Sequence, residues 1–135
     1  MPKATRWFAL SGLVVFFDYI SKIAVLGSFS PGESRALTSF FNLVLVFNKG
    51  AAFSFLATAQ GWQTIFFAAI AIVASFVIGV LILKNKEKEL FCGGLALILG
   101  GALGNLYDRI AYGHVVDFLD FHAAGWHWPA FNVAD

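Results

Sequence analysis

Three long stretches of the chain are almost free of charged residues, and polar segments separate them. The stretches cover residues 7–26, 62–83 and 90–107. Each is close to the length of about 20 apolar residues that a helix needs to cross a bilayer. Asp18 and Lys22 are the only charges, and both lie in the second half of the first stretch. We therefore predict a mainly α-helical, polytopic membrane protein.

The first stretch has a second interpretation. Lys3 and Arg6 precede an apolar run with no acidic residue among them, and this order is also typical of a cleaved signal peptide. However, the run is long, carries charges near its end and shows no small-residue cleavage site near Leu26. These features favour a helix that stays in the protein.

Residues 27–61 differ from their surroundings. Gly27, Pro31 and Gly32 interrupt a helix, and residues 37–47 are rich in Phe, Val and Leu, which favours strands. An Asn48-Lys49-Gly50 turn follows, and an apolar run resumes over residues 51–56. We predict a small β-like segment over 27–61 that lies on the membrane surface.

The C-terminal region is expected to return to the membrane. We predict a loop over residues 109–128 and the start of a fourth helix near Pro129, after the aromatic pair Trp126 and Trp128. The seven residues from 129 to 135 are too few to cross a bilayer. We therefore expect the natural protein to continue by about 20 apolar residues, and a chain ending at Asp135 to be poorly active.

The basic residues predict an orientation. Lys3 and Arg6 precede the first stretch, while Lys84, Lys86 and Lys88 lie between the second and the third. Because lysine and arginine are enriched in cytoplasmic loops, these two places belong on the cytoplasmic side. Residues 27–61 and 109–128 then lie together on the opposite side.

Composition excludes several classes of function. The chain is 59% hydrophobic and 13% charged, about half the charged fraction of a soluble domain. A net charge of +1 provides no basic field for nucleic acid. The single cysteine, Cys92, and three widely placed histidines predict a buried packing thiol and no metal site. No heptad pattern is present, so we expect one domain and a monomer.

The polar residues within or beside the stretches gather at one predicted depth, the outer interface. They are Asp18, Lys22, Asn48, Asn105, Asp108, Arg109, Asp117 and Asp135. Ionisable groups at such depths are costly and usually face a protein interior or a wet cavity. Simpler interpretations remain open: Asp18 and Lys22 could be an intrahelical ion pair, and Asp108 and Arg109 could anchor a helix end. Asp120 is expected to be a solvated or structural carboxylate.

Asp117 and Asp135 are both flanked by apolar residues, in VVDF and FNVAD. Two carboxyl groups held close together share a proton, because both cannot ionise at once. Such a pair can activate water for direct attack on a peptide bond without a metal or a cofactor. No serine shows histidine and aspartate partners, and Cys92 is predicted to lie in mid-membrane. We therefore predict an aspartate pair as the catalytic group.

Five segments together resemble the bacterial lipoprotein signal peptidase family (signal peptidase II), in the order that the family shows. They are 18–22 (DYISK), 48–53 (NKGAAF), 100–109 (GGALGNLYDR), 115–118 (VVDF) and 131–135 (FNVAD). The resemblance implies a four-helix enzyme of the bacterial inner membrane with a periplasmic β-cradle. Such an enzyme removes the signal peptide from diacylglyceryl prolipoproteins, immediately before the lipidated cysteine.

The resemblance also implies residue roles. Asp117 and Asp135 correspond to the catalytic pair, and Asp108 to a structural acid. The residues expected to line the site and bind substrate or globomycin-type inhibitors are Asn48, Asn105, Arg109, Asn132, Asp18 and Lys22. The family uses no metal or cofactor, and its partners are the prolipoprotein substrate and membrane lipids.

Two other functions remain as alternatives. A small transporter or proton-relay subunit would also carry intramembrane Asp and Lys, although it would need them at the bilayer centre. A non-catalytic scaffold could use the third stretch, where Ala96, Gly100 and Gly104 recur every four residues and let a neighbouring backbone approach closely.

Overall fold

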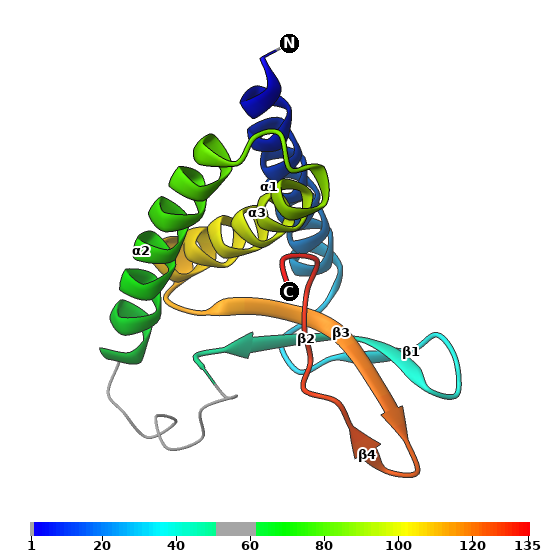
Figure 1. Ribbon diagram of the computed structural model, residues 1–135. Coiled ribbons are helices and arrows are strands. Elements are labelled where there is room, and N and C mark those ends of the chain that lie inside the picture. Colours follow the sequence, from blue (N-terminus) through cyan, green and yellow to red (C-terminus); the bar gives the residue numbers. More distant parts are fainter. Residues whose placement is uncertain (1, 51–61) are drawn as a thin grey trace.

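The fold consists of three long helices gathered on one side of a small sheet, seen in a computed structural model that describes residues 2–50 and 62–135 (Figure 1). The elements in chain order are α1 (Lys3–Ser28), β1 (Ser34–Ala36), β2 (Phe41–Asn48), α2 (Trp62–Lys84), α3 (Glu89–Tyr112), β3 (Val115–Ala123) and β4 (Trp126–His127). The first residues of α1 and the α2–α3 connection lie at one end of the helices, and the sheet lies at the other.

All three helices are long and apolar enough to cross a membrane. Each contains one of the three apolar stretches predicted from the sequence and extends beyond it. The largest difference is in α3, which continues to Tyr112. It ends at Gly113, whose φ of +76° is a left-handed conformation that glycine adopts readily because it has no Cβ. The Gly113 N–H donates to the Arg109 carbonyl at 3.1 Å.

The sheet has four antiparallel strands in the order β1-β2-β3-β4. In the long β2–β3 pair, Phe41 faces Phe121 and Asn48 faces Val115, with an irregularity between Leu43 and Val46. The β-like segment predicted over 27–61 thus contains β1 and β2. Residues 51–61, including the apolar run over 51–56, lie outside the described residues.

Residues 109–128 are not the loop that we predicted. They complete α3 and then form β3 and β4. The strand was missed because Asp117 and Asp120 interrupt its run of Val, Phe and Leu. Those two polar residues are tolerated because neighbouring amide groups bind them.

The predicted start of a fourth helix near residue 129 is also wrong for residues 129–135. Phe131 instead forms an isolated bridge with Leu119. Its N–H donates to the Leu119 carbonyl at 3.1 Å, and its carbonyl accepts from the N–H groups of Phe118 and Leu119 at 2.9 Å. This return segment, residues 128–135, therefore pairs with β3.

The small residues of α3 allow close packing, as the spacing of Ala96, Gly100 and Gly104 predicted. The Ser11 hydroxyl of α1 donates to the Ala96 carbonyl at 2.8 Å. A Cβ at Gly100 would lie 2.5 Å from the Val14 Cβ, so only glycine permits this contact. α1 and α3 are thereby held close, and polar side chains at their outer ends can meet.

Two hydrophobic clusters hold the elements in place. Val25 of α1 packs with Leu45, Val116 and Phe118, which fastens the sheet beneath α1. Ile82, Leu99 and the buried Cys92 join α2 to α3. Because Val116 and Phe118 flank Asp117, burial of these two side chains fixes where that carboxylate lies.

We expect Gly101→Ala to displace the return segment. A Cβ at Gly101 would lie 2.0 Å from the Ala134 carbonyl oxygen, and backbone must move to relieve such a contact. Overpacking of this kind costs about 1–3 kcal/mol, which unfolding in detergent micelles would measure. Gly94→Ala on the same helix is the control, since nothing lies within 4 Å of its Cβ. Equal stability of both variants would contradict this packing.

Candidate active site

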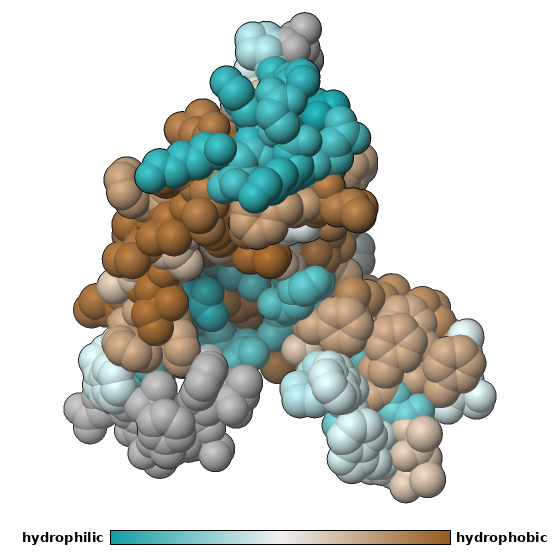
Figure 2. Space-filling view, in the orientation of Figure 1, coloured by the Kyte–Doolittle hydropathy of each residue, from teal (hydrophilic) through white to brown (hydrophobic). Residues whose placement is uncertain are grey.

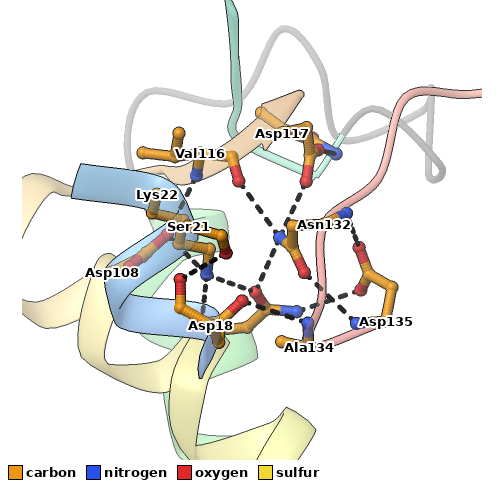
Figure 3. Close-up of polar contacts among 11 residues, drawn as sticks. Asp18, Ser21, Lys22, Asp108, Val116, Asp117, Asn132, Ala134 and Asp135 are labelled. Atoms are coloured by element: carbon orange, nitrogen blue, oxygen red, sulfur yellow. Dashed lines mark hydrogen bonds and ion pairs between the residues drawn. The ribbon is translucent and has the colours of Figure 1, made fainter. Parts of the chain in front are cut away.

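The polar residues predicted to converge do so at the outer ends of α1 and α3, where these helices meet the sheet and the return segment. Figure 2 shows hydrophilic residues in a hollow between the apolar helices and the lobe formed by the sheet. Figure 3 shows the contacts that link them. The members joined by hydrogen bonds or ion pairs are Asp18, Lys22, Asn48, Asn105, Asp108, Asp117, Asn132 and Asp135.

Asp117 is a nearly inaccessible carboxylate, with 2% of its surface exposed. The Asn48 side-chain amide donates to its Oδ2 at 2.9 Å, and the Asn132 amide donates to its Oδ1 at 2.9 Å. Burial raises the pKa of Asp117 to about 7 from an ordinary 3.8; the hydrogen bond from Asn48 opposes the rise, and the negative charge of Asp135 adds to it. Asp117 can therefore hold or release a proton near neutral pH.

Asp135 has a different setting. It is exposed, and its Oδ1 accepts a hydrogen bond at 3.0 Å from the Asn105 amide. Its Oδ2 accepts from the Asn132 backbone N–H at 3.2 Å. Asp117 is thus bound by two asparagine side chains, whereas Asp135 is bound by Asn105 and by the backbone of its own segment.

Asn132 joins the two aspartates. It is 1% exposed, and its side-chain amide lies between Asp117 Oδ1, Asn105 Oδ1 and the Val116 carbonyl, at 2.9, 3.0 and 3.1 Å. Its Oδ1 accepts from the Asp135 N–H at 3.2 Å. These contacts favour a role in orienting both carboxylates.

Lys22 lies at the centre of a buried charge cluster. Its ammonium is 2.7 Å from Asp18, 2.9 Å from Asp108 and 3.1 Å from Asn105 Oδ1. The intrahelical pair between Asp18 and Lys22 is present, and Asp108 completes a triad between two helices. Because all three side chains are buried, their nearest groups are other parts of the protein.

The two acids of this triad also hold backbone. Asp108 Oδ2 accepts from the Val116 N–H at 3.0 Å, and Asp18 Oδ1 accepts from the Ala134 N–H at 3.0 Å. Val116 and Ala134 each precede one of the two candidate catalytic aspartates. The triad therefore positions both.

Arg109 is half-buried at the end of α3, with its guanidinium 5.4 Å from the centre of the Phe67 ring. It experiences the charges of Asp135, Asp117 and Asp108. Simple anchoring of the helix end does not require these neighbours. The guanidinium is therefore within electrostatic range of both aspartates.

Sequence reasoning missed Asn42 and His127. Asp120 is a structural carboxylate, as one of its two interpretations predicted. It accepts from the Asn42 amide at 3.1 Å and lies 2.8 Å from His127 Nδ1. Neither partner stands near Asp120 in a recognisable motif, so only strand pairing reveals them. Among the described residues, no group of three His, Cys, Asp or Glu side chains is placed to hold a metal ion.

Comparison with known proteins identifies the family. The model of the family described as signal peptidase (SPase) II matches residues 10–135. This chain belongs to the signal peptidase II family. The lipoprotein signal peptidase of Burkholderia vietnamiensis is 59% identical over 129 residues, which cover 96% of this chain and 78% of that protein. That of Janthinobacterium sp. is 57% identical, with the same coverage.

A solved structure has a similar fold. It is a bacterial membrane enzyme determined by the in meso method at 1.9 Å, with a TM-score of 0.85 and 28% identity. The match covers 97% of this chain and 83% of that one. Signal peptidase II membership and three apolar helices make this protein a membrane-embedded peptidase, which disfavours the transporter and the scaffold.

We expect Lys22→Met to destabilise the fold strongly, because it leaves Asp18 and Asp108 buried without a counter-charge. Breaking a buried pair in this way costs about 3–5 kcal/mol. Lys3→Met is the matched control, since its ion pair with Glu87 is exposed and such pairs contribute little to stability. Unfolding of both variants in micelles measures the difference. A Lys22→Met protein as stable as the control would contradict the role of the triad.

Asp117→Asn should reduce the loss of stability that the wild type shows as pH rises. The pKa of Asp117 is raised in the folded state. Its contribution to the free energy of unfolding is therefore fully present below pH 3.8 and is lost as pH rises through about 7. An amide carries no charge at any of these pH values. We expect the stability of the variant relative to the wild type to increase by about 1–3 kcal/mol between pH 4 and pH 8. A difference that does not change with pH would show that Asp117 ionises normally.

Proposed function

We propose that this protein is an aspartic endopeptidase that removes the signal peptide from diacylglyceryl-modified prolipoproteins, immediately before the lipidated cysteine. The observation that carries the proposal is the arrangement of Asp117 and Asp135 around Asn132, which contacts both residues through its side-chain amide and its backbone N–H. Family membership supports the substrate class, because the relatives are lipoprotein signal peptidases.

The two carboxyl groups suit direct hydrolysis. Asp135, in its ionised form, takes a proton from water as the water oxygen bonds to the scissile carbonyl carbon. Asp117, in its protonated form, donates its proton to the carbonyl oxygen, which gives a neutral tetrahedral diol. When the C–N bond breaks, Asp135 gives its proton to the leaving nitrogen, and the proton of a diol hydroxyl returns to Asp117.

A groove beside the aspartates can receive an extended peptide. It has a volume of about 610 Å³ and contains Asp117, Asp135, Asn48 and the segment Trp128–Phe131. Val46 to Asn48, at the end of β2, and the next residue, Lys49, also line it. We propose that Asn48, which lines the groove, binds the substrate backbone together with Asn105 and Arg109, both of which interact with Asp135. Globomycin-type inhibitors would occupy the same groove.

Asn132, Asp18 and Lys22 contribute to substrate binding indirectly. All three are buried, so we assign them the task of holding the groove's other residues in place. Asp108 has the same structural task, through Val116.

The position of the site at one end of the helices suits a lipidated substrate. Each buried CH₂ group holds a diacylglyceryl chain in the bilayer by about 0.8 kcal/mol, so cleavage has to occur at the interface. We propose an inner-membrane protein with the N-terminus and the α2–α3 connection in the cytoplasm and the sheet in the periplasm. Ion pairs of Lys3 with Glu87 and of Arg6 with Glu89 group the charges at the cytoplasmic end.

We also propose that the protein works as a monomeric four-helix bundle in contact with membrane lipids. An apolar groove runs between α1 and α3 beside Asp135, and its helical lining is Val14, Phe17, Leu97 and Ile98. A fourth apolar helix packed there would cover these side chains and hold the return segment against α3.

The direct experiment is cleavage of a lipidated prolipoprotein by purified protein in micelles, with Asp117→Asn and Asp135→Asn variants. Each substitution removes one proton-transfer group, so we expect kcat to fall by at least about 100-fold while the fold and substrate binding remain. Glu87→Gln, which also replaces a carboxylate by an amide, lies at the opposite end and should cleave normally. Near-normal turnover by either aspartate variant would assign that residue a structural role.

A further inference from the structure

Another buried carboxylate, Asp120, lies three residues after Asp117 on β3 and has no part in the proposed chemistry. It is 8% exposed. Its Oδ1 lies 2.8 Å from Nδ1 of His127 on β4, and its Oδ2 accepts at 3.1 Å from the Asn42 amide on β2. One side chain therefore connects three strands of the sheet.

The hairpin that carries His127 has little else to hold it. β4 has only two residues, and its pairing with β3 is limited to His122 with His127 and Ala123 with Trp126. The connecting turn places both Ala124 and Gly125 in the left-handed region, at φ values of 52° and 80°. That conformation is unfavourable for alanine. A hairpin this short is marginal by itself, so its side-chain contacts matter.

The segment after His127 leads directly to the candidate active site. The Trp128 N–H donates to the Phe121 carbonyl at 2.8 Å, and Phe131 then pairs with Leu119. Asn132, the next residue, contacts Asp117. A shift of His127 along β3 would therefore move Asn132 and Asp135 relative to Asp117.

We propose that Asp120 and His127, supported by Asn42, form a positioning pair that sets the register of the return segment on β3. This register determines where Asn132 and Asp135 lie relative to Asp117. The inference deepens the proposed peptidase function and depends on it. Neither residue contacts the reacting atoms.

The charge state of Asp120 agrees with this role. Burial acts to raise its pKa, but hydrogen bonds from His127 and Asn42 hold the pKa of Asp120 below its usual value. The titratable groups that act on it are His127 and His122, whose rings stack with centres 4.9 Å apart. Asp120 is thus a carboxylate at neutral pH and can accept both hydrogen bonds.

The test compares two substitutions of His127 in the full chain, assayed with lipidated prolipoprotein in micelles. His127→Phe keeps a ring to stack on His122 but removes the nitrogen that contacts Asp120. His127→Asn places an amide nitrogen close to the position of Nδ1, and so provides the conservative rescue. Glu33→Gln is the control, because Glu33 pairs with Arg35 beside β1, in the same sheet but away from His127.

We expect His127→Phe to lower kcat about tenfold with KM unchanged within twofold, since a misplacement of about 1 Å can cost 100-fold in rate. His127→Asn should recover most of the loss, and Glu33→Gln should behave as the wild type. Asp120→Leu, which removes both hydrogen-bonding oxygens, should lower kcat as His127→Phe does, and the double variant should be no slower than either single one.

A second readout does not require activity. In the wild type, Asp117 makes the free energy of unfolding fall as pH rises to about 7. If Asp135 and the segment covering Asp117 move away in His127→Phe, the pKa of Asp117 falls, and this loss of stability should occur at lower pH. A protein that was merely less stable would keep the same pH window.

The outcomes separate the two proposals. If the wild type does not cleave a lipidated prolipoprotein, the proposed function fails, and the pH window of unfolding still tests the positioning pair. If the wild type cleaves and His127→Phe keeps both normal kcat and an unchanged pH window, the positioning pair is refuted and the peptidase proposal stands.

Discussion

The rest of the site depends on a lysine ammonium buried between two carboxylates of different helices. Lys22 and Asp18 come from α1, and Asp108 comes from α3. Burying charges is costly, and an arrangement of this kind persists only when every member is paired and hydrogen-bonded. The remaining oxygens of the two acids bind the backbone of Val116 and Ala134. The cluster that joins α1 to α3 thereby also fixes β3 and the return segment, the two segments that carry the aspartates.

The two aspartates occupy different environments because different elements carry them: Asp117 lies on β3 and Asp135 on the return segment. Asp117 lies on a strand whose neighbours Val116 and Phe118 pack against α1, so its carboxylate is drawn out of water with them. Asp135 follows a segment that lies against α3, where the Ala134 N–H donates to Asp18. The raised pKa of Asp117 thus follows from packing, since burial of its carboxyl group is the largest cause of the rise.

The sequence predicted the helices and the identity of the candidate residues, but not the burial or the partners of those residues. Uncharged stretches indicated the three helices because a long apolar run has few other solutions. The resemblance indicated the aspartates, the asparagines and the charged helix residues, and the structure brings these together. The burial of Asn132 and the partners of Asp120 could not be predicted, because both depend on how the return segment pairs with β3. That pairing also explains why residues 129–135 form no helix, although Pro129 and the aromatic residues before it suggested one.

The sequence by itself determined the class of protein, the number of apolar helices in the described chain and the family, since these follow from composition, run length and ordered motifs. Tertiary structure decided which polar residues contact each other and which of the two carboxylates is buried. Those properties arise where α1, α3, β3 and the return segment meet. Contacts between residues 83 or 116 positions apart, such as Lys22 with Asn105 and Asp18 with Ala134, have no signature in a local pattern of side chains.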